Sequence, residues 1–168
     1  MAGNSGEKDR MIQKVTSMQP FFHDYFDILK TCHNDFHKAL NGLPPEALDW
    51  VAGADMNSIS VLVYHLTGAE RYWIGDVALG ESSNRDRSAE FKVRAVGMEA
   101  LRQRLDDSLS YASAALEKLT LHDLESIRTS PRDGRTFTIA WALLHALEHS
   151  NLHLGHVQMI RQLWEQRK

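Results

Sequence analysis

Four histidines recur at three- and four-residue intervals near the end of this 168-residue sequence. His145, His149 and His153 are four residues apart, and His156 follows three residues later. Such intervals return to nearly the same face of an α-helix. Imidazole nitrogens stacked in this way can bind one divalent cation, as they do in helical metal sites. The segment therefore predicts a metal site.

A third ligand should come from another helix, because two histidines rarely hold a metal tightly. His65 is the best candidate, since Leu62 and Leu66 lie beside it at helical positions and indicate that it faces the interior. Spacing alone leaves open which histidines of the later segment complete the site. His145 and His156 could each replace a ligand or hydrogen-bond to one.

Other reactive residue types have simpler interpretations. We expect Cys32 to be a small core residue, Glu148 to face solvent, and Glu70 and Tyr72 to serve in capping or salt bridges more than in substrate contact. No acid–base residue is evident near the proposed ligands. We expect core or solvent positions for the remaining histidines, which are His23, His33, His37 and His122. We expect packing roles for the tryptophans, which are Trp50, Trp73, Trp141 and Trp164.

The composition is that of an ordinary globular protein, with 43% hydrophobic and 24% charged residues. The formal net charge is −3 and no dense basic run is present, so we expect no nucleic-acid partner. No apolar run approaches the roughly 20 residues of a membrane helix, and the first ten residues lack a signal-peptide core, so we expect no membrane association. Cys32 is the single cysteine, which excludes an intrachain disulfide and fits a cytoplasmic location.

Helical periodicity dominates the chain and predicts an all-α four-helix bundle. Residues 1–17 read as a flexible polar N-terminus, and 18–168 as a single domain. Strand signals are weak throughout. We also expect a homodimer, because bundles with apolar outer stripes commonly pair. The expected helices span about 18–40, 58–80 (after a cap at Asn57 or Ser58), 97–118 and 138–166, with a polar loop at 81–90 and a turn at 130–134.

Two sequence patterns resemble those of a known family. The second helix reads SIxxLxxHLxGAExxW from Ser58 to Trp73, and the last reads WxLLHxxEHxxxHxGH from Trp141 to His156. Together they resemble the DinB superfamily, whose members have the DinB/YfiT-like four-helix-bundle fold and a metal site. The loop LPPEALDW, residues 43–50, is similar to the family's first interhelix loop.

The resemblance implies a particular ligand set. In the family, one histidine on the second helix and a pair four apart on the fourth hold the metal, which implies His65, His149 and His153 here. In some branches, including mycothiol-dependent maleylpyruvate isomerase, the middle ligand is glutamate and an arginine precedes the last ligand. This chain has His149 and Leu152 at those positions, so three neutral imidazoles are implied.

Three protein ligands leave coordination positions open on Zn²⁺, Ni²⁺ or Fe²⁺, which is typical of a catalytic site. The family resemblance implies thiol chemistry, in which a small-molecule thiol is transferred to a small electrophile by a metal-dependent S-transferase or isomerase. Two alternatives stay open: a metal-dependent hydrolase, and a metal-stabilised stress-response binding module without catalysis. From the reference pKa of imidazole, about 6.5, metal affinity should fall between about pH 7 and 5.

Overall fold

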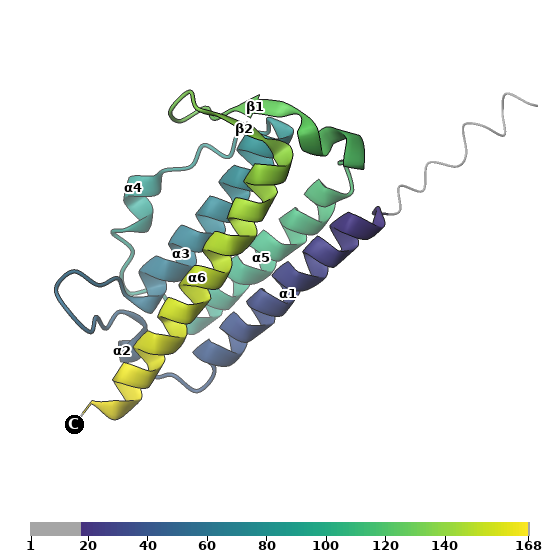
Figure 1. Ribbon diagram of the computed structural model, residues 1–168. Helices are drawn as coiled ribbons and strands as arrows, with labels where there is room; N and C mark the ends of the chain where they lie inside the picture. Colours follow the sequence, from purple (N-terminus) through teal and green to yellow (C-terminus); the bar gives the residue numbers. More distant parts are fainter. Residues whose placement is uncertain (1–17, 168) are drawn as a thin grey trace, which may run out of the picture.

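The computed structural model describes residues 18–167 and is a four-helix bundle (Figure 1). The expected flexible N-terminus, 1–17, lies outside the described residues. Several ends of the long helices coincide with capping or breaking residues: Ser58 and Thr138 accept backbone amides at two N-termini, and Gly42 follows the first helix with φ +77°. The long helices are α1 (Pro20–Leu40), α3 (Ile59–Glu70), α5 (Met98–Leu116) and α6 (Ile139–Gln166).

Helices α1 and α3 do not neighbour each other closely; each packs against both α5 and α6. The order around the bundle is therefore α1, α6, α3, α5. This arrangement sets the His65 helix directly beside the histidine-rich helix, as Figure 1 shows for α3 and α6. Within residues 18–167, no helix combines the length and the apolar character needed to cross a membrane.

Helix α3 continues without a break into η2 (Arg71–Leu79), which is a π-helix. Within this segment Gly75 lies close to other side chains: an added Cβ would lie 2.5 Å from the hydroxyl of Tyr111 and would also overlap Arg71. A side chain at this position would therefore displace the side chains of Arg71 and Tyr111. The sequence predicted one regular α-helix to residue 80. That prediction is wrong from Arg71 onward, where the helix changes from α to π. Gly80 does end the helix, with φ +73°.

The short elements lie around the ends and one side of the bundle (Figure 1). The prediction that strand was weak everywhere missed a hairpin of two three-residue strands, in which Ile127 pairs with Thr138 in antiparallel register. The turn predicted at 130–134 connects them. These elements are α2 (Pro45–Leu48), α4 (Arg87–Glu90), η3 (Leu121–Glu125), β1 (Ile127–Thr129) and β2 (Thr136–Thr138).

The hydrophobic core is divided into two clusters, one toward each end of the bundle. A buried polar layer separates them, formed by one residue from each long helix. Its members are His33, Glu70, Ser108 and Ser150. The three candidate metal ligands lie close to this layer in sequence, because Ser150 follows His149 directly and Glu70 follows His65 by five residues.

Candidate metal centre

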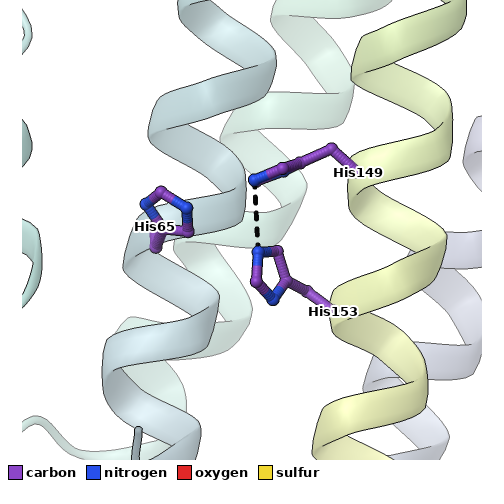
Figure 2. Close-up of side chains that lie close together, drawn as sticks. All are labelled: His65, His149 and His153. Atoms are coloured by element: carbon purple, nitrogen blue, oxygen red, sulfur yellow. Dashed lines mark hydrogen bonds between the residues drawn. The ribbon is translucent and has the colours of Figure 1, made fainter.

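His65, His149 and His153 meet between α3 and α6 (Figure 2). One ligand atom from each lies within 4.8 Å of the others. The ring of His65 is 5.0 Å from that of His149 and 5.1 Å from that of His153, between centroids. The structure thus brings together the three residues that the sequence patterns selected, and all three rings point into the same space between the helices.

His65 is oriented by a carboxylate that the sequence did not predict to be near it. Its Nδ1 lies 3.0 Å from Oε2 of Glu90, in α4. An ionised carboxylate only accepts hydrogen bonds, so Nδ1 carries the hydrogen and Nε2 keeps its lone pair for a metal. A carboxylate behind a ligating histidine is a common feature of metal sites, where it fixes the tautomer and the ring orientation.

Glu90 is itself held firmly. It is 5% exposed, and Arg85 donates to both of its oxygens, from Nε to Oε1 at 2.6 Å and from Nη2 to Oε2 at 2.8 Å. Burial would raise the pKa of Glu90, but the hydrogen bonds from Arg85 and His65 outweigh burial and lower it. Because both oxygens are already engaged by charged or polar donors, Glu90 is suited to positioning His65 and not to accepting a substrate proton.

Gly68 makes the approach of Glu90 to α3 possible. A Cβ at this glycine would overlap Oε1 of Glu90 and lie 2.9 Å from its Cδ. This is the glycine of the HLxGAE pattern on the second helix. Its role is therefore steric, because a side chain at this position of α3 would occupy the space in which the carboxylate of Glu90 reaches His65.

The other two rings converge through their Nε2 atoms. Nε2 of His149 and Nε2 of His153 are 3.2 Å apart, as the dashed line in Figure 2 marks. Two imidazole nitrogens bound to one tetrahedral metal at about 2.0–2.1 Å lie about 3.3 Å apart, so the pair fits a shared cation. Nδ1 of His153 lies 3.3 Å from Nδ1 of His156, which can accept its hydrogen. Among the described residues, Nδ1 of His149 has no hydrogen-bond partner.

Comparison with protein families confirms the resemblance. The model of the DinB superfamily matches residues 28–157. The chain belongs to the DinB superfamily. Among curated proteins, no significant match to this DinB-superfamily chain is found.

Solved structures with the same fold share little sequence with this DinB-superfamily chain. A conserved protein from Enterococcus faecalis has a TM-score of 0.71 at 14% identity and covers 90% of this chain and 100% of its own. YfiT from Bacillus subtilis is described as a probable metal-dependent hydrolase with an unusual four-helix bundle topology. It has a TM-score of 0.70 at 15% identity, and the match covers 89% of this chain and 91% of YfiT. A DinB-like protein from Bacillus cereus has a TM-score of 0.69 at 16% identity, and the match covers 84% of this chain and 91% of that protein. At these identities the comparisons establish the fold.

The two other histidines of the DinB-type terminal pattern have supporting positions. His145 stacks on Trp141, with ring centroids 4.7 Å apart, and its Nδ1 is 3.4 Å from Glu148. Its ring is 5.9 Å from that of His149, outside the cluster of three. His156 is exposed and contacts His153. Neither the ring of His145 nor that of His156 joins the convergent set.

Several further expectations can be compared with the structure. Cys32 is 2% exposed, and burial, helped by Glu70 and Asp35, raises the pKa of its thiol to about 12, so it is a core residue. Glu148 faces solvent as expected. Trp141 departs from a simple packing role, because it is 42% exposed and stacks on Phe137 and His145.

The electrostatic environment keeps the paired rings neutral. Burial, with the neighbouring His153 and His65 adding to its effect, lowers the pKa of His149 to about 3. Burial likewise lowers the pKa of His153 to about 4, with His65 and His156 adding to the effect. A metal requires neutral imidazole, so these two side chains are ready to ligate across the whole physiological pH range.

We expect the metal-free protein to lose stability as the pH falls below about 6.5. Between about pH 6.5 and 4 the unfolded chain binds protons at His149 and His153, whereas both rings stay neutral in the folded chain, so acid favours unfolding. For the same reason, protons should compete with the metal at His149 and His153 only below about pH 5, which is lower than the window expected from the reference pKa. Thermal melts of EDTA-treated protein and zinc titrations across this range measure both effects. The double variant His149→Gln, His153→Gln should show a flatter melting profile; an unchanged slope would contradict the assignment.

A second expected result concerns Glu90. Glu90→Gln should weaken zinc binding by roughly 10- to 100-fold, because His65 loses the charged acceptor that fixes its tautomer. Gly68→Ala should have a similar effect, since its methyl group displaces the same carboxylate. Competitive titration against a zinc chelator measures both, with the exposed Glu148→Gln as the matched control. If zinc affinity is the same in Glu90→Gln and in the control, Glu90 does not position the ligand.

Proposed function

We propose that this chain is a divalent-metal-dependent enzyme, with the metal held by His65, His149 and His153. The observation that carries the proposal is the convergence of these side chains from two helices, with His65 fixed by Glu90 and His153 backed by His156. Three neutral nitrogen ligands suit Zn²⁺, Ni²⁺ or Fe²⁺ and leave a coordination position open. A closed structural site would instead use four protein ligands.

We further propose that the substrate includes a small-molecule thiol, which is transferred to a small electrophile. A divalent metal bound at such a site supplies a positive charge that lowers the pKa of a coordinating thiol and can polarise an electrophile. The uncharged imidazoles leave that charge undiminished. Cys32 does not compete as nucleophile, because it is buried in the core with a raised pKa.

Metal-dependent hydrolysis is the second candidate, favoured by the description of YfiT as a probable metal-dependent hydrolase. Activating water commonly requires a general base beside the metal. The buried carboxylate next to the ligands, Glu90, is already engaged by Arg85 and His65. A thiol deprotonates far more readily than water, so it needs no such base, and for this reason we favour transfer of a thiol.

Cobalt substitution tests the proposed thiol chemistry. With Co²⁺ in place of the native metal, a small thiol such as 2-mercaptoethanol should add an intense sulfur-to-metal charge-transfer band in the near ultraviolet while the metal stays bound. The matched alcohol, ethylene glycol, should leave the spectrum unchanged. Thiol consumption with a panel of electrophiles then identifies the reaction.

The opposite result separates the alternatives. If no thiol changes the spectrum and an ester or amide panel is hydrolysed, the hydrolase candidate stands in place of the transferase. If neither occurs and removing the metal only lowers the melting temperature, the metal ties α3 to α6 and the protein is a binding module without catalysis.

A further inference from the structure

A cavity of about 690 Å³ lies between α3, α4 and α5, and none of the three clustered histidines lines it. Its volume is in the range of small-molecule pockets, roughly 300–1,000 Å³. Glu90 belongs to its wall and also contacts His65. The cavity and the candidate metal centre therefore share one carboxylate but are otherwise built from different residues.

Three arginines line this cavity, and two of them have carboxylate partners within the protein. Arg71 pairs with Asp76 at 3.2 Å, and Arg85 pairs with Glu90 at 2.6 Å. Arg104 differs from both: within residues 18–167, no carboxylate lies at ion-pair distance from its guanidinium. It is thus the cavity's cation without an internal counter-ion.

Arg104 is nevertheless held in place. Its Nε donates to Oγ1 of Thr67 at 2.8 Å, and its guanidinium lies 4.1 Å above the centre of the Tyr64 ring. The side chain is half-buried, and burial lowers its pKa despite the favourable fields of Tyr64 and Glu90. Charges removed from water are normally paired, so a fixed, half-buried guanidinium that faces an open cavity is suited to an anionic ligand.

The remaining charges of the wall limit what that anion can be. Arg71 and Arg85 already have ion-pair partners in Asp76 and Glu90, so Arg104 is the cation that faces the other two of the three carboxylates among the lining residues. The charge of a monoanion would be neutralised by Arg104, whereas the second charge of a dianionic phosphate would be repelled by those carboxylates. Apolar surface beside them would receive a hydrocarbon group. The carboxylates are Asp86, Glu90 and Asp107, and the apolar residues are Ala89, Val93 and Ala100.

We propose that this cavity binds a small monocarboxylic acid, with the carboxylate on the guanidinium of Arg104 and the hydrocarbon part against Val93 and Ala100. The planar guanidinium matches a carboxylate through two parallel N–H···O bonds. This site is separate from the metal centre proposed above, and its occupancy does not depend on a bound metal.

Calorimetric titration of EDTA-treated protein tests the proposal, because any carboxylate binding then cannot occur at a metal. The probes are acetate, benzoate, phenylacetate and octanoate, with benzamide as the uncharged match to benzoate and inorganic phosphate as the dianion. At least one monocarboxylate should bind, and benzoate should bind more tightly than benzamide. Arg104→Gln should weaken binding by roughly tenfold or more, since a charge-assisted hydrogen-bonded pair is lost.

Arg102→Gln is the matched control, because Arg102 is on the same helix but does not line the cavity. It should bind the carboxylate as the unchanged protein does. Arg104→Lys keeps the positive charge but loses the planar guanidinium, so its affinity for the carboxylate should lie between those of Arg104→Gln and Arg102→Gln. This variant also tests the proposal if Arg104→Gln does not fold. Absence of binding by all four acids at millimolar concentration, tighter binding of phosphate, equal binding of benzamide, or equal weakening in Arg102→Gln would each overturn the proposal.

Discussion

His153→Ala should weaken zinc binding by roughly a hundredfold or more. Structural zinc sites with four ligands have binding free energies of about 10–16 kcal/mol, so one ligand contributes several kcal/mol, and two imidazoles cannot retain the metal at low concentration. His65→Ala and His149→Ala should behave alike, since all three rings converge on one point. Chelator competition gives the affinities, and metal analysis after gel filtration gives the stoichiometry.

The histidines outside the cluster provide the controls. His23→Ala changes an exposed histidine on α1 and should leave zinc affinity unchanged. His145→Ala should have little effect, because its ring stacks on Trp141 outside the convergent set. If His145→Ala abolishes binding while His149→Ala retains it, the ligand set is shifted by one turn and the assignment is wrong.

Glu70→Ala should destabilise the protein by about 3–5 kcal/mol, because it leaves a buried histidine without its counter-charge. Glu70 is 1% exposed and accepts hydrogen bonds from His33, Ser108 and Ser150. Burial would raise the pKa of Glu70 and lower that of His33, but their mutual attraction outweighs burial and holds the pair charged. For a chain of this length the melting temperature should fall by roughly 10 °C.

The double variant His33→Leu, Glu70→Leu isolates the cause. Replacing both partners removes the uncompensated charge, so this protein should be more stable than Glu70→Ala. Glu148→Ala, at an exposed site on α6, should change stability by less than about 0.5 kcal/mol. Equal stability of Glu70→Ala and Glu148→Ala, measured by urea denaturation, would show that the buried pair contributes nothing.

The positions of the long helices could be predicted from the sequence because capping residues and periodic apolar residues are local signals. Ser58 and Thr138 start α3 and α6, and the four-residue spacing of His149 and His153 fixes their common face. Leu62 and Leu66 indicated that His65 faces the interior and made it the candidate partner, but periodicity does not say which helices are neighbours. The family resemblance implied that the His65 helix lies beside the last helix, and the contact between α3 and α6 confirms that these helices are neighbours.

Glu90 could not be predicted because its burial depends on tertiary contacts. It ends a polar segment, residues 81–90, that resembles a solvated loop, and it is 25 residues from the histidine that it orients. The polar loop predicted at 81–90 therefore ends in a short helix, α4, whose last residue is buried. Gly68 carried the only local signal, a helix-interior glycine with a packing reason.

The π-helix and the hairpin escaped prediction for different reasons. Nine residues of η2 keep an apolar pattern that does not distinguish the π turn from an α turn. The strands β1 and β2 are three residues each and largely exposed, with Ile127 68% exposed, so no buried alternation marks them. Their formation depends on the turn between them and on packing of Phe137 against Trp73 and Trp141.

Anomalous diffraction at the zinc absorption edge, from crystals of protein loaded with one equivalent of zinc, tests the metal site most directly. We expect a single anomalous peak per chain between α3 and α6, within bonding distance of His65, of Nε2 of His149 and of Nε2 of His153, with Glu90 still bonded to Nδ1 of His65. A peak bound to other side chains, or no peak at equimolar zinc, would contradict the proposed metal centre.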